Sequence, residues 1–436
     1  MRIAVVGINY APELTGIAVY TTGLAEDLAA RGIDVTAYTG FTYYPAWSKQ
    51  RGDRGRWYRR ERINAVDVRR SYLYVPSRPT AWKRMLHELS FVISVAGSYL
   101  LGPKADCTII VSPPLLLGIP IALLAKLKRS KAIFHVQDLQ PDAAVDLGML
   151  KKGRLTALLY RVERITYKLV HNVSTISHGM LERISGKGVD PEKLFIFRNW
   201  ANDDHVVPAA KQTRYRDAFG LNEKFVVLYS GNMGVKQGLD VLLEAAEFLK
   251  NVDSVVFLIV GDGGQKRELQ ARAHAMQLTN LIFLPLQPYD RLGELLATAD
   301  VSVIPQKKGV TDIVLPSKLG NIFASERPVI AAASEDCEFG RIVRASGGGV
   351  LVKPGHARQI ADAVMHLYAS PEKCVAMARA GRRFMEKEFS RRSILDEFTD
   401  RIMFSDEPRV SAGQDGPVER EPKHPSDAPV ARYLVR

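Results

Sequence analysis

The stretch FVVLYSGNMGVKQGLDVLLEA, residues 225–245, decides the fold class of this chain. It opens with FVVLYS, six residues whose apolar and aromatic side chains are typical of a buried strand. A glycine turn follows, and Lys236 stands just before a run with the spacing of a helix. A strand, a glycine turn and a helix in this order form the repeating unit of a parallel α/β sheet.

The same unit recurs through the second half of the chain. VGDGGQKRELQ, residues 260–270, again joins a strand end to a helix through a glycine turn. Further strand candidates, with helical runs between them, are 255–260, 281–284, 301–304, 328–332 and 348–352. The second half is therefore predicted to be one doubly wound sheet.

The first half alternates in the same way. Ile17, Tyr20, Leu24 and Leu28 form one apolar helix stripe, and Gly32 is placed to end that helix. The strand candidates are 3–8, 35–38, 107–111, 132–136 and 172–176. A chain of 436 residues suggests two domains, at about 100–200 residues each. Two facing doubly wound domains would form a cleft beyond the carboxyl ends of their strands.

Composition narrows the class of protein. Hydrophobic residues make up 46% and charged residues 25% of the chain, which are globular values. The three cysteines, Cys107, Cys337 and Cys374, form no CxxC pair, so neither a zinc site nor a disulfide framework is indicated. This cysteine usage favours a reducing, cytosolic setting. The N-terminus, MRIAVVGI, has no signal-peptide pattern.

The net charge of +13 is concentrated in residues 49–84, which hold 12 Lys or Arg against three acids. Such a segment is either a solvated face or a surface for anionic lipid, a phosphate-bearing substrate or nucleic acid. The longest apolar run, residues 89–102, has 14 residues and is shorter than the roughly 20 that span a bilayer. It is expected to be a buried helix or an interfacial one.

The first strand leads into GINYAPELTGIAVY, residues 7–20. This loop is not the GxGxxG of a dinucleotide dehydrogenase, because no second glycine follows Gly7 before Gly16. Thr15, Gly16 and Ile17 stand at a helix N-terminus, where unpaired N–H groups can hold a phosphate. The alternative is that Thr15 is a plain N-cap.

A second basic turn lies in LPSKLGNIFASERPVIA, residues 315–331, where Lys318 precedes a short amphipathic run. A basic side chain beside a helix start suggests an anion. Each of these glycine or basic turns could be an ordinary turn. Their order along the chain is more specific than any one of them.

Four stretches together resemble a known family, the family-4 retaining glycosyltransferases of the two-Rossmann GT-B fold. They are NYAPELTGIAVYTTGLAEDLAARG, HVQDLQPDA, YSGNMGVKQGLDVLLEAA and LPSKLGNIFASERPVIA, and they look like the exopolysaccharide branch typified by the colanic acid biosynthesis fucosyltransferase. The resemblance covers residues 1–404. It implies an acceptor domain at 1–205, a nucleotide-sugar domain at 206–387, and a last helix, about 388–404, crossing back to the first domain. Residues 405–436, rich in Pro, Asp, Glu and Ser, are expected to be a disordered tail.

The resemblance also implies site residues. The family's phosphate-binding Lys matches Lys236, while its Arg position holds Asn232. Its two glutamates, eight residues apart, fall on Ile313 and Asn321, which leaves Asp312 as a nearby substitute for the first. A catalytic set of His135, Asp138 and Lys236 follows, with His135 also open to interpretation as a hydrogen-bonded core residue. The implied donor-binding residues are Gly16, Ile17, Gly231, Asn232, Lys236, Gly261, Asp262, Pro316, Ser317, Lys318 and Asn321.

The implied activity is transfer of a sugar from a nucleoside diphosphate donor with retention of configuration, without a metal or another cofactor. GDP-fucose is one possible donor, and a lipid-linked saccharide at the inner face of the plasma membrane is the implied acceptor. The basic segment 49–84 and residues 82–102 would then contact an anionic membrane surface. Alternatives are a transferase of UDP-linked acetamido sugars and, further away, an epimerase or hydrolase of the same architecture. A nucleic-acid-binding protein lacks any supporting motif.

Overall fold

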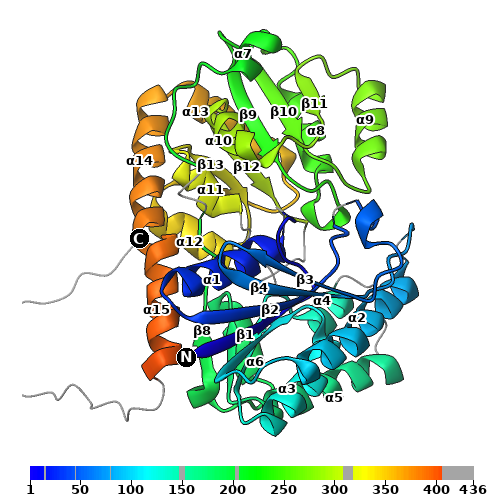
Figure 1. Ribbon diagram of the computed structural model, residues 1–436. Helices are drawn as coiled ribbons and strands as arrows, with labels where there is room; N and C mark the ends of the chain where they lie inside the picture. The colour runs from blue at the N-terminus through cyan, green and yellow to red at the C-terminus, as the bar shows by residue number, and fades with distance from the viewer. Residues whose placement is uncertain are drawn as a thin grey trace, which may run out of the picture.

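The computed structural model describes residues 1–13, 16–44, 46–78, 80–146, 153–201, 206–307 and 318–404. Two sheets, each covered by helices, lie one above the other in Figure 1. All strand pairs but one are parallel among the pairs described. The predicted α/β class, with two facing Rossmann-like domains, is confirmed.

The first sheet has eight strands in the order β3-β4-β2-β1-β5-β6-β7-β8. Chain order and spatial order differ because helices carry the chain across the sheet between parallel neighbours. The five predicted strands of this half are present, each with small shifts of its ends. The strands are β1 (Arg2–Val6), β2 (Asp34–Gly40), β3 (Tyr58–Ile63), β4 (Val66–Ser71), β5 (Cys107–Ser112), β6 (Lys131–Val136), β7 (Asn172–Thr175) and β8 (Leu194–Ile196).

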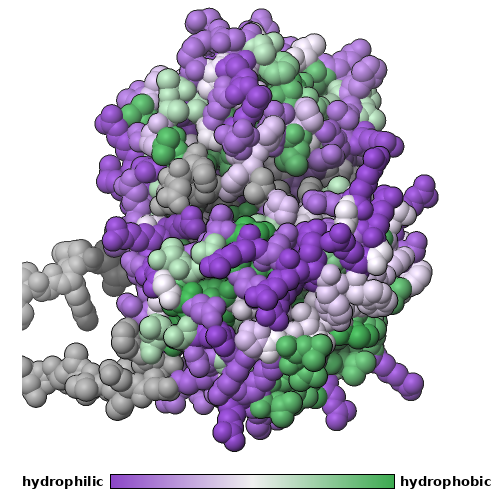
Figure 2. Space-filling model, viewed as in Figure 1, coloured by the Kyte–Doolittle hydropathy of each residue, from purple (hydrophilic) through white to green (hydrophobic). Residues whose placement is uncertain are grey.

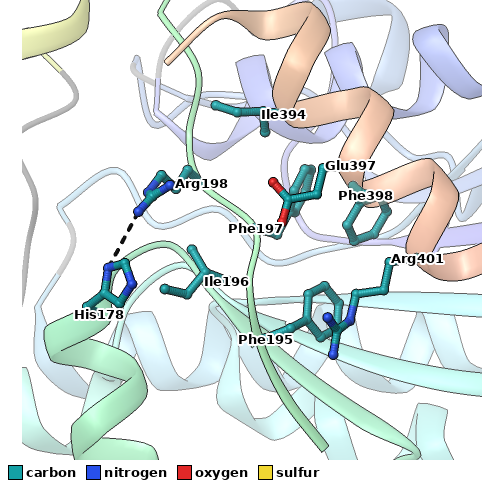
Figure 3. Close-up of a pocket in the computed structure, with 9 residues that line it drawn as sticks. All are labelled: His178, Phe195, Ile196, Phe197, Arg198, Ile394, Glu397, Phe398 and Arg401. Atoms are coloured by element: carbon teal, nitrogen blue, oxygen red, sulfur yellow. Dashed lines mark hydrogen bonds between the residues drawn. The ribbon is translucent and has the colours of Figure 1, made fainter. Parts of the chain in front are cut away.

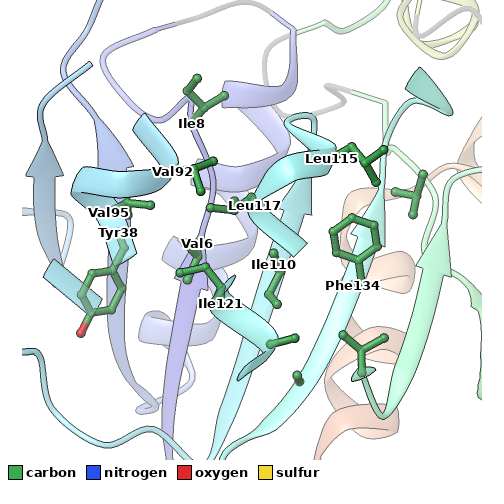
Figure 4. Close-up of a cluster of buried hydrophobic side chains, with 14 of the residues drawn as sticks. Val6, Ile8, Tyr38, Val92, Val95, Ile110, Leu115, Leu117, Ile121 and Phe134 are labelled. Carbon is green, nitrogen blue, oxygen red and sulfur yellow. The ribbon is translucent and has the colours of Figure 1, made fainter. Parts of the chain in front are cut away.

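Helices pack on both faces of this sheet. Figure 4 shows part of the core on one face, where Val6 and Ile110 of neighbouring strands meet Val92 and Val95 of α2. These apolar contacts fix the strand ends, and therefore the loops that follow them, on one edge. The helices are α1 (Ile17–Ala30), α2 (Ala81–Leu101), α3 (Gly118–Leu127), α4 (Gln140–Asp146), α5 (Arg154–Leu169) and α6 (His178–Ser185).

The β3–β4 hairpin was not predicted, and it lies in the basic segment 49–84. Its strands, YRRERI and VDVRRS, contain adjacent arginines and no apolar run, so the sequence gives little strand signal. Arg70 is buried, pairs with Glu61 and donates to the carbonyl oxygens of Gly40 and Ala11. The segment is therefore not a uniformly solvated face, because part of its charge is used inside the first domain.

The second domain has a six-stranded parallel sheet in the order β11-β10-β9-β12-β13-β14. All six predicted strands are present with ends within one residue of the expected ones. They are β9 (Phe225–Ser230), β10 (Val255–Val260), β11 (Leu281–Leu284), β12 (Val301–Pro305), β13 (Val329–Ala332) and β14 (Gly349–Val352). The helices include α7 (Arg214–Ala218), α8 (Asp240–Phe248), α9 (Lys266–Ala275), α10 (Leu292–Ala297), α11 (Lys318–Ala324), α12 (Glu338–Ser346), α13 (Ala357–Tyr368) and α14 (Pro371–Glu388).

The last helix, α15 (Arg391–Phe404), returns to the first domain, as the orange and red ribbon of Figure 1 shows. Its Leu395 and Phe398 are buried in the cluster that contains Ile3 and Val5 of β1. The chain thus crosses between the domains twice. The exact boundary at 205/206 stays a prediction, and the predicted tail at 405–436 lies outside the described residues.

Helix α2 contains the apolar run 89–102 except Gly102, which follows the helix end. The run is partly buried and partly exposed, so each of the two predicted alternatives describes part of it. Phe91, Val95 and Tyr99 are buried in the first domain, whereas Leu89 and Ile93 are exposed. Within the described part of the chain, no helix is both long and apolar enough to cross a membrane.

Candidate functional site

Two glycine turns meet at the carboxyl edge of the second sheet. Gly231 follows β9 and Gly261 follows β10, and both have φ of 147°. A Cβ at Gly261 would lie 1.9 Å from the carbonyl oxygen of Gly231, so a side chain there has no room. Both positions therefore require glycine, for backbone conformation and for close approach. The pair forms a floor of bare backbone at the edge where open parallel sheets bind ligands.

Lys318 reaches this floor from the start of α11. Its Nζ donates to the hydroxyl oxygen of Tyr229 at 2.8 Å, and a Cβ at Gly231 would lie 2.3 Å from the same Nζ. Burial lowers the pKa of Lys318 to about 7. Among the described residues, the contact of this ammonium group is the neutral Tyr229, so the group is suited to an anionic ligand, which would raise its pKa again.

Asn232 and Asp262 join the two turns to each other. The Tyr229 hydroxyl donates to the Asn232 carbonyl oxygen at 2.6 Å, and the Met233 amide donates to the Asp262 carbonyl oxygen at 2.8 Å. The Asp262 carboxylate accepts from the Gly263 amide at 2.8 Å. Gly231, Asn232, Gly261, Asp262 and Lys318 thus lie in one site.

Tyr229 belongs to the same site and was missed in the sequence. It is buried, and burial raises its pKa. The available signal was a hydroxyl-bearing aromatic residue that follows four apolar residues near the end of a strand.

The other predicted site residues of the second domain are described by the structure to different extents. Lys236 lies in a short 3-10 turn, Val235–Gln237, between Gly234 and Gly238, and its side chain is outside the described set. Asn321 lies on α11 one turn after Lys318 and is half-buried. Asp312, Ile313, Pro316 and Ser317 lie outside the described residues.

On the first domain, α1 begins at Ile17. Gly16 precedes it with φ of 63°, is exposed, and provides no side-chain cap, while Thr15 is outside the described residues. The amides of this first turn are therefore at the carboxyl edge of β1, on the same edge of the first sheet as the ends of β5 and β6. This position suits the predicted phosphate contact, which stays a prediction.

His135 is at the end of β6 and is buried. The side-chain amide nitrogen of Gln137 donates to Nε2 of His135 at 2.9 Å. Because Nε2 accepts this hydrogen bond, Nδ1 of the neutral ring carries the proton and donates to Ser174 Oγ at 2.9 Å. Burial lowers the pKa of His135 to about 3, so the ring is neutral. These contacts favour the alternative of a hydrogen-bonded core residue over direct contact with a sugar.

The hydrogen-bond chain continues from His135 toward the strand ends. Gln137 Oε1 accepts from the side-chain amide of Asn199 at 2.9 Å, just after β8. Asp138 is half-buried on the loop into α4. His135 thus holds Gln137 and Asn199, two polar residues that the sequence analysis did not select because neither belongs to a motif.

The two domains also contact each other directly. Glu338, at the start of α12, accepts from the backbone amides of His178 and Gly179 at 3.1 and 2.9 Å. These amides open α6 of the first domain, where a carboxylate is favoured by the helix dipole. A cavity of about 170 Å³ lies between β8 and α15 and is also lined by His178. Figure 3 shows Arg198, Glu397 and Arg401 among the side chains around it. It lies away from the glycine turns.

Among the described residues, no group of three or more His, Cys, Asp or Glu side chains is arranged to hold a metal ion.

Comparison with protein families gives two matches that together span most of the chain. Residues 15–200 match the glycosyl transferase 4-like domain, and residues 211–384 match the glycosyl transferases group 1 family. A curated relative from Escherichia coli K12, with the name "Putative colanic acid biosynthesis glycosyl transferase WcaI", is 36% identical over 406 residues. That alignment covers 91% of this chain and 99% of the relative.

Solved structures show the same fold at low sequence identity. Sucrose-phosphate synthase from Thermosynechococcus elongatus has a TM-score of 0.73 at 18% identity, covering 93% of this chain and 99% of the other. HepE from Anabaena, solved with UDP and glucose, has a TM-score of 0.68 at 13% identity, covering 93% and 100%. With the family matches and the full-length relative, these findings show that the chain belongs to the GT-B glycosyltransferases with a 4-like first domain and a group 1 second domain.

Proposed function

We propose that this glycosyltransferase moves a sugar from a nucleoside diphosphate donor to a lipid-linked saccharide in the assembly of an exopolysaccharide, with retention of anomeric configuration. The relative named for colanic acid biosynthesis and the HepE structure with UDP and glucose support the pathway class and the donor class. GDP-fucose remains one candidate donor, and a UDP-linked acetamido sugar is the other.

The observation that carries the proposal is the position of Lys318 on the Gly231 and Gly261 turns. The diphosphate of a donor needs positive charge and close backbone, and this edge offers both. The opposite wall offers the first-turn amides of α1 at Gly16 and Ile17. A Cβ added to Gly320 of α11 would lie 3.1 Å from the Cβ of Ala201, so α11 packs closely on the segment that leads into the second domain.

In the reaction, the bond between the anomeric carbon and the diphosphate oxygen breaks, and the leaving group takes the electron pair. The acceptor hydroxyl oxygen forms the new bond on the same face, and its proton passes to the departing phosphate. Lys318, Lys236 and the amides at Gly16 stabilise the charge that develops on the leaving group. Asn232 stands where the family has an Arg, so the two lysines and the backbone bear more of this task.

In this proposal, His135 and Asp138 position other groups of the site and do not react with the sugar. We assign no covalent nucleophile, and the neutral His135 serves by holding Gln137 and Asn199. Asn321 would hydrogen-bond a ribose hydroxyl from α11. The reaction as proposed requires no metal ion, so transfer should continue in the presence of a chelator.

The acceptor would be reached from the membrane surface. The exposed apolar residues of α2 repeat at helical spacing, with Trp82, Met85, Leu86, Leu89 and Ile93 on one face. Figure 2 shows hydrophobic residues gathered at the lower right, where α2, α3 and α5 lie in Figure 1.

Basic residues accompany this apolar surface. Leu123 and Leu127 of α3 are exposed beside the exposed Lys126, and Leu158 of α5 is exposed with Arg161. Apolar and basic side chains together suit an anionic bilayer, which would bind the protein peripherally at the inner face of the plasma membrane.

The donor half of the proposal is tested with purified protein. Melting temperature is measured with GDP, UDP and their sugars, since a ligand of the native state raises it. The shifting donor is then used to compare turnover of Lys236→Ala with that of Lys250→Ala, an exposed lysine at the end of α8. Loss of a charge contact to the leaving group should reduce turnover about a hundredfold in Lys236→Ala only. Equal turnover in both variants would remove the assignment.

The membrane half is tested by flotation with phosphatidylglycerol liposomes at low and high salt. We expect binding at low salt that weakens at high salt. Ile93→Glu should reduce it, whereas Val375→Glu, on the exposed surface of α14, should not. Absence of binding at low salt would contradict this half and leave the donor chemistry untouched.

A further inference from the structure

The cavity between β8 and α15 lies where the chain crosses between the two domains. Residues 197–201 lead from β8 toward the second domain, and α15 returns to the first. The two crossings are joined by a hydrogen bond from the Ala201 amide to the Phe389 carbonyl oxygen at 2.9 Å. Arg198 of the first crossing and Glu397 of α15 both line the cavity. A ligand in it would therefore contact both crossings.

The floor of this cavity is apolar. Phe195 and Phe197, in β8 and just after it, and Phe398 of α15 are buried and line it. The rings of Phe197 and Phe398 stack with centroids 4.0 Å apart. At about 170 Å³, the cavity has room for several water molecules of about 30 Å³ each, or for one small organic molecule. An apolar floor with a few polar groups above it is typical of a site for a small organic ligand.

One end of the cavity has donors for an anion. Figure 3 shows Arg198 and His178 side by side at this end. A guanidinium N–H of Arg198 donates to Nδ1 of His178 at 3.5 Å, which is long for a hydrogen bond. Among the described residues, His178 is the side chain that this guanidinium contacts. A phosphate placed here would accept charge-assisted hydrogen bonds from Arg198 and from protonated His178.

Glu397 adds a carboxylate to the same cavity. It is exposed, and among the side chains drawn in Figure 3 no hydrogen bond reaches it. Arg401, one turn further along α15, has the spacing of an ion-pair partner. Its guanidinium carbon lies instead over the Phe195 ring, 4.5 Å from the centroid. The acceptor positions of Glu397 are therefore available to hydroxyl donors in the cavity.

The charges around the cavity indicate the chemical class of its ligand. The two arginines and one glutamate leave a net charge of +1 on the wall, without a proton on His178. A neutral sugar would not pair with the arginines, and a bare anion would be repelled by Glu397 without contacting the apolar floor. A sugar phosphate has a phosphate for Arg198, hydroxyl groups for Glu397 and C–H groups for the phenylalanine rings.

We infer that this cavity is a binding site for a small sugar phosphate. The phosphate contacts Arg198 and His178, the sugar hydroxyls donate to Glu397, and Arg401 donates to a ligand oxygen at the other end. The site is distinct from the proposed donor site at Lys318. It takes no part in the transfer reaction and does not depend on which donor or acceptor the enzyme uses.

The position of the site suits an effector. The backbone amide of His178 donates to Glu338 of the second domain at 3.1 Å. The residue after Arg198, Asn199, donates to Gln137 at the carboxyl edge of the first sheet at 2.9 Å. A ligand that contacts His178 and Arg198 is therefore one residue away from the edge network and directly beside the contact between the domains.

The test is isothermal titration of the full chain with a panel of hexose 1-phosphates and 6-phosphates. We expect at least one of them to bind saturably. Inorganic phosphate and the free hexose should bind at least about tenfold more weakly, because each lacks part of the contacts. Equal affinity for inorganic phosphate would overturn the sugar phosphate as the ligand.

Variants of the two walls test the contacts. Arg198→Gln should bind the sugar phosphate about 10–100-fold more weakly, the usual effect of losing a hydrogen bond to a charged group. Glu397→Ala, at an exposed position, should bind it about tenfold more weakly but inorganic phosphate more tightly, since a repulsive charge is removed. Arg392→Gln and Asp400→Asn change exposed residues of α15 that do not line the cavity, and should bind like the wild type.

Lys318→Met separates this site from the proposed donor site. It should bind the sugar phosphate like the wild type, and hydrogen–deuterium exchange should slow in residues 391–404 on binding but not at the Gly231 and Gly261 turns. Three results would overturn the inference. They are the absence of binding across the panel, unchanged affinity in both Arg198→Gln and Glu397→Ala, and loss of binding in Lys318→Met.

Discussion

The carboxyl edges of the two sheets are built in different ways. On the second domain, the proposed donor site consists of glycine backbone at Gly231 and Gly261 with one lysine, Lys318, packed against it. On the first domain, the corresponding edge has side chains from separate elements, such as Glu13 on the loop after β1 and Glu88 on α2, which are held by hydrogen bonds. A site made of backbone cannot move aside for an added side-chain atom, so one substitution disrupts the whole site. In a network of side chains, one substitution removes only the hydrogen bonds of that side chain. The two edges should therefore respond differently to mutation.

The sharpest test of this difference is Gly261→Ala. A Cβ would lie 1.9 Å from the Gly231 carbonyl oxygen, and a φ of 147° alone costs about 1–3 kcal/mol for a non-glycine residue. We expect the melting temperature to fall by roughly 5–10 °C and nucleotide-sugar binding to be lost. Gly264→Ala is the control, because no atom lies within 4 Å of its Cβ position. Normal binding by Gly261→Ala would show that the turns are less rigid than described.

A smaller effect is expected from the ionisation of Lys318. Because burial lowers its pKa to about 7, the free protein loses this positive charge as the pH rises above 7. A bound diphosphate favours the protonated form and raises the pKa. Affinity for a nucleotide sugar should therefore fall between pH 7 and pH 9, by at most about tenfold per pH unit.

The measurement is isothermal titration with a nucleotide sugar, whose diphosphate bears no group that titrates in this range. Lys318→Met is the control variant. It should bind about 10–100-fold more weakly at pH 7, since a hydrogen bond to a charged group contributes about 1.5–3 kcal/mol. Its affinity should not change with pH. The same pH dependence in wild type and Lys318→Met would assign the effect to another group.

The two domains also differ in how much of their structure could be predicted from the sequence. The second-domain strands and glycine turns were predicted because each lies in a continuous stretch with its own periodicity. Gly231, Asn232, Gly261, Asp262 and Lys318 were selected for the same reason, and the fold brings them together. Local sequence was sufficient because backbone conformation is largely a local property.

On the first domain, the sequence was less informative. The β3–β4 hairpin was missed because Arg70, a charged residue, occupies a buried strand position and is satisfied by Glu61 and two carbonyl groups. Glu13 and Glu88 were not selected, since a single carboxylate has no pattern around it. Their surroundings come from loops that meet only through the order of strands in the sheet.

The contact between the domains allows a further, milder test. Glu338→Ala would leave the amides of His178 and Gly179 without the acceptor that they have at 3.1 and 2.9 Å. Loss of a buried acceptor should reduce the free energy of unfolding by about 1–3 kcal/mol. Glu335→Ala, which removes an exposed pair with Arg344, is the control and should change it by less than about 0.5 kcal/mol. Urea denaturation measures both, and equal values would mean that Glu338 does not connect the domains.

The smallest effect is expected where α15 lies on the first domain. Asp396 of α15 pairs with Arg31 of α1 at 2.6 Å, but both side chains are partly exposed and Arg31 also pairs with Asp27. Asp396→Asn should therefore change the free energy of unfolding by no more than about 0.5 kcal/mol, and salt should reduce the difference. Asp400→Asn, one turn further along the exposed face, gives the baseline. A loss above about 1 kcal/mol would mean that charge, and not the packing of Leu395 and Phe398, holds the crossing helix in place.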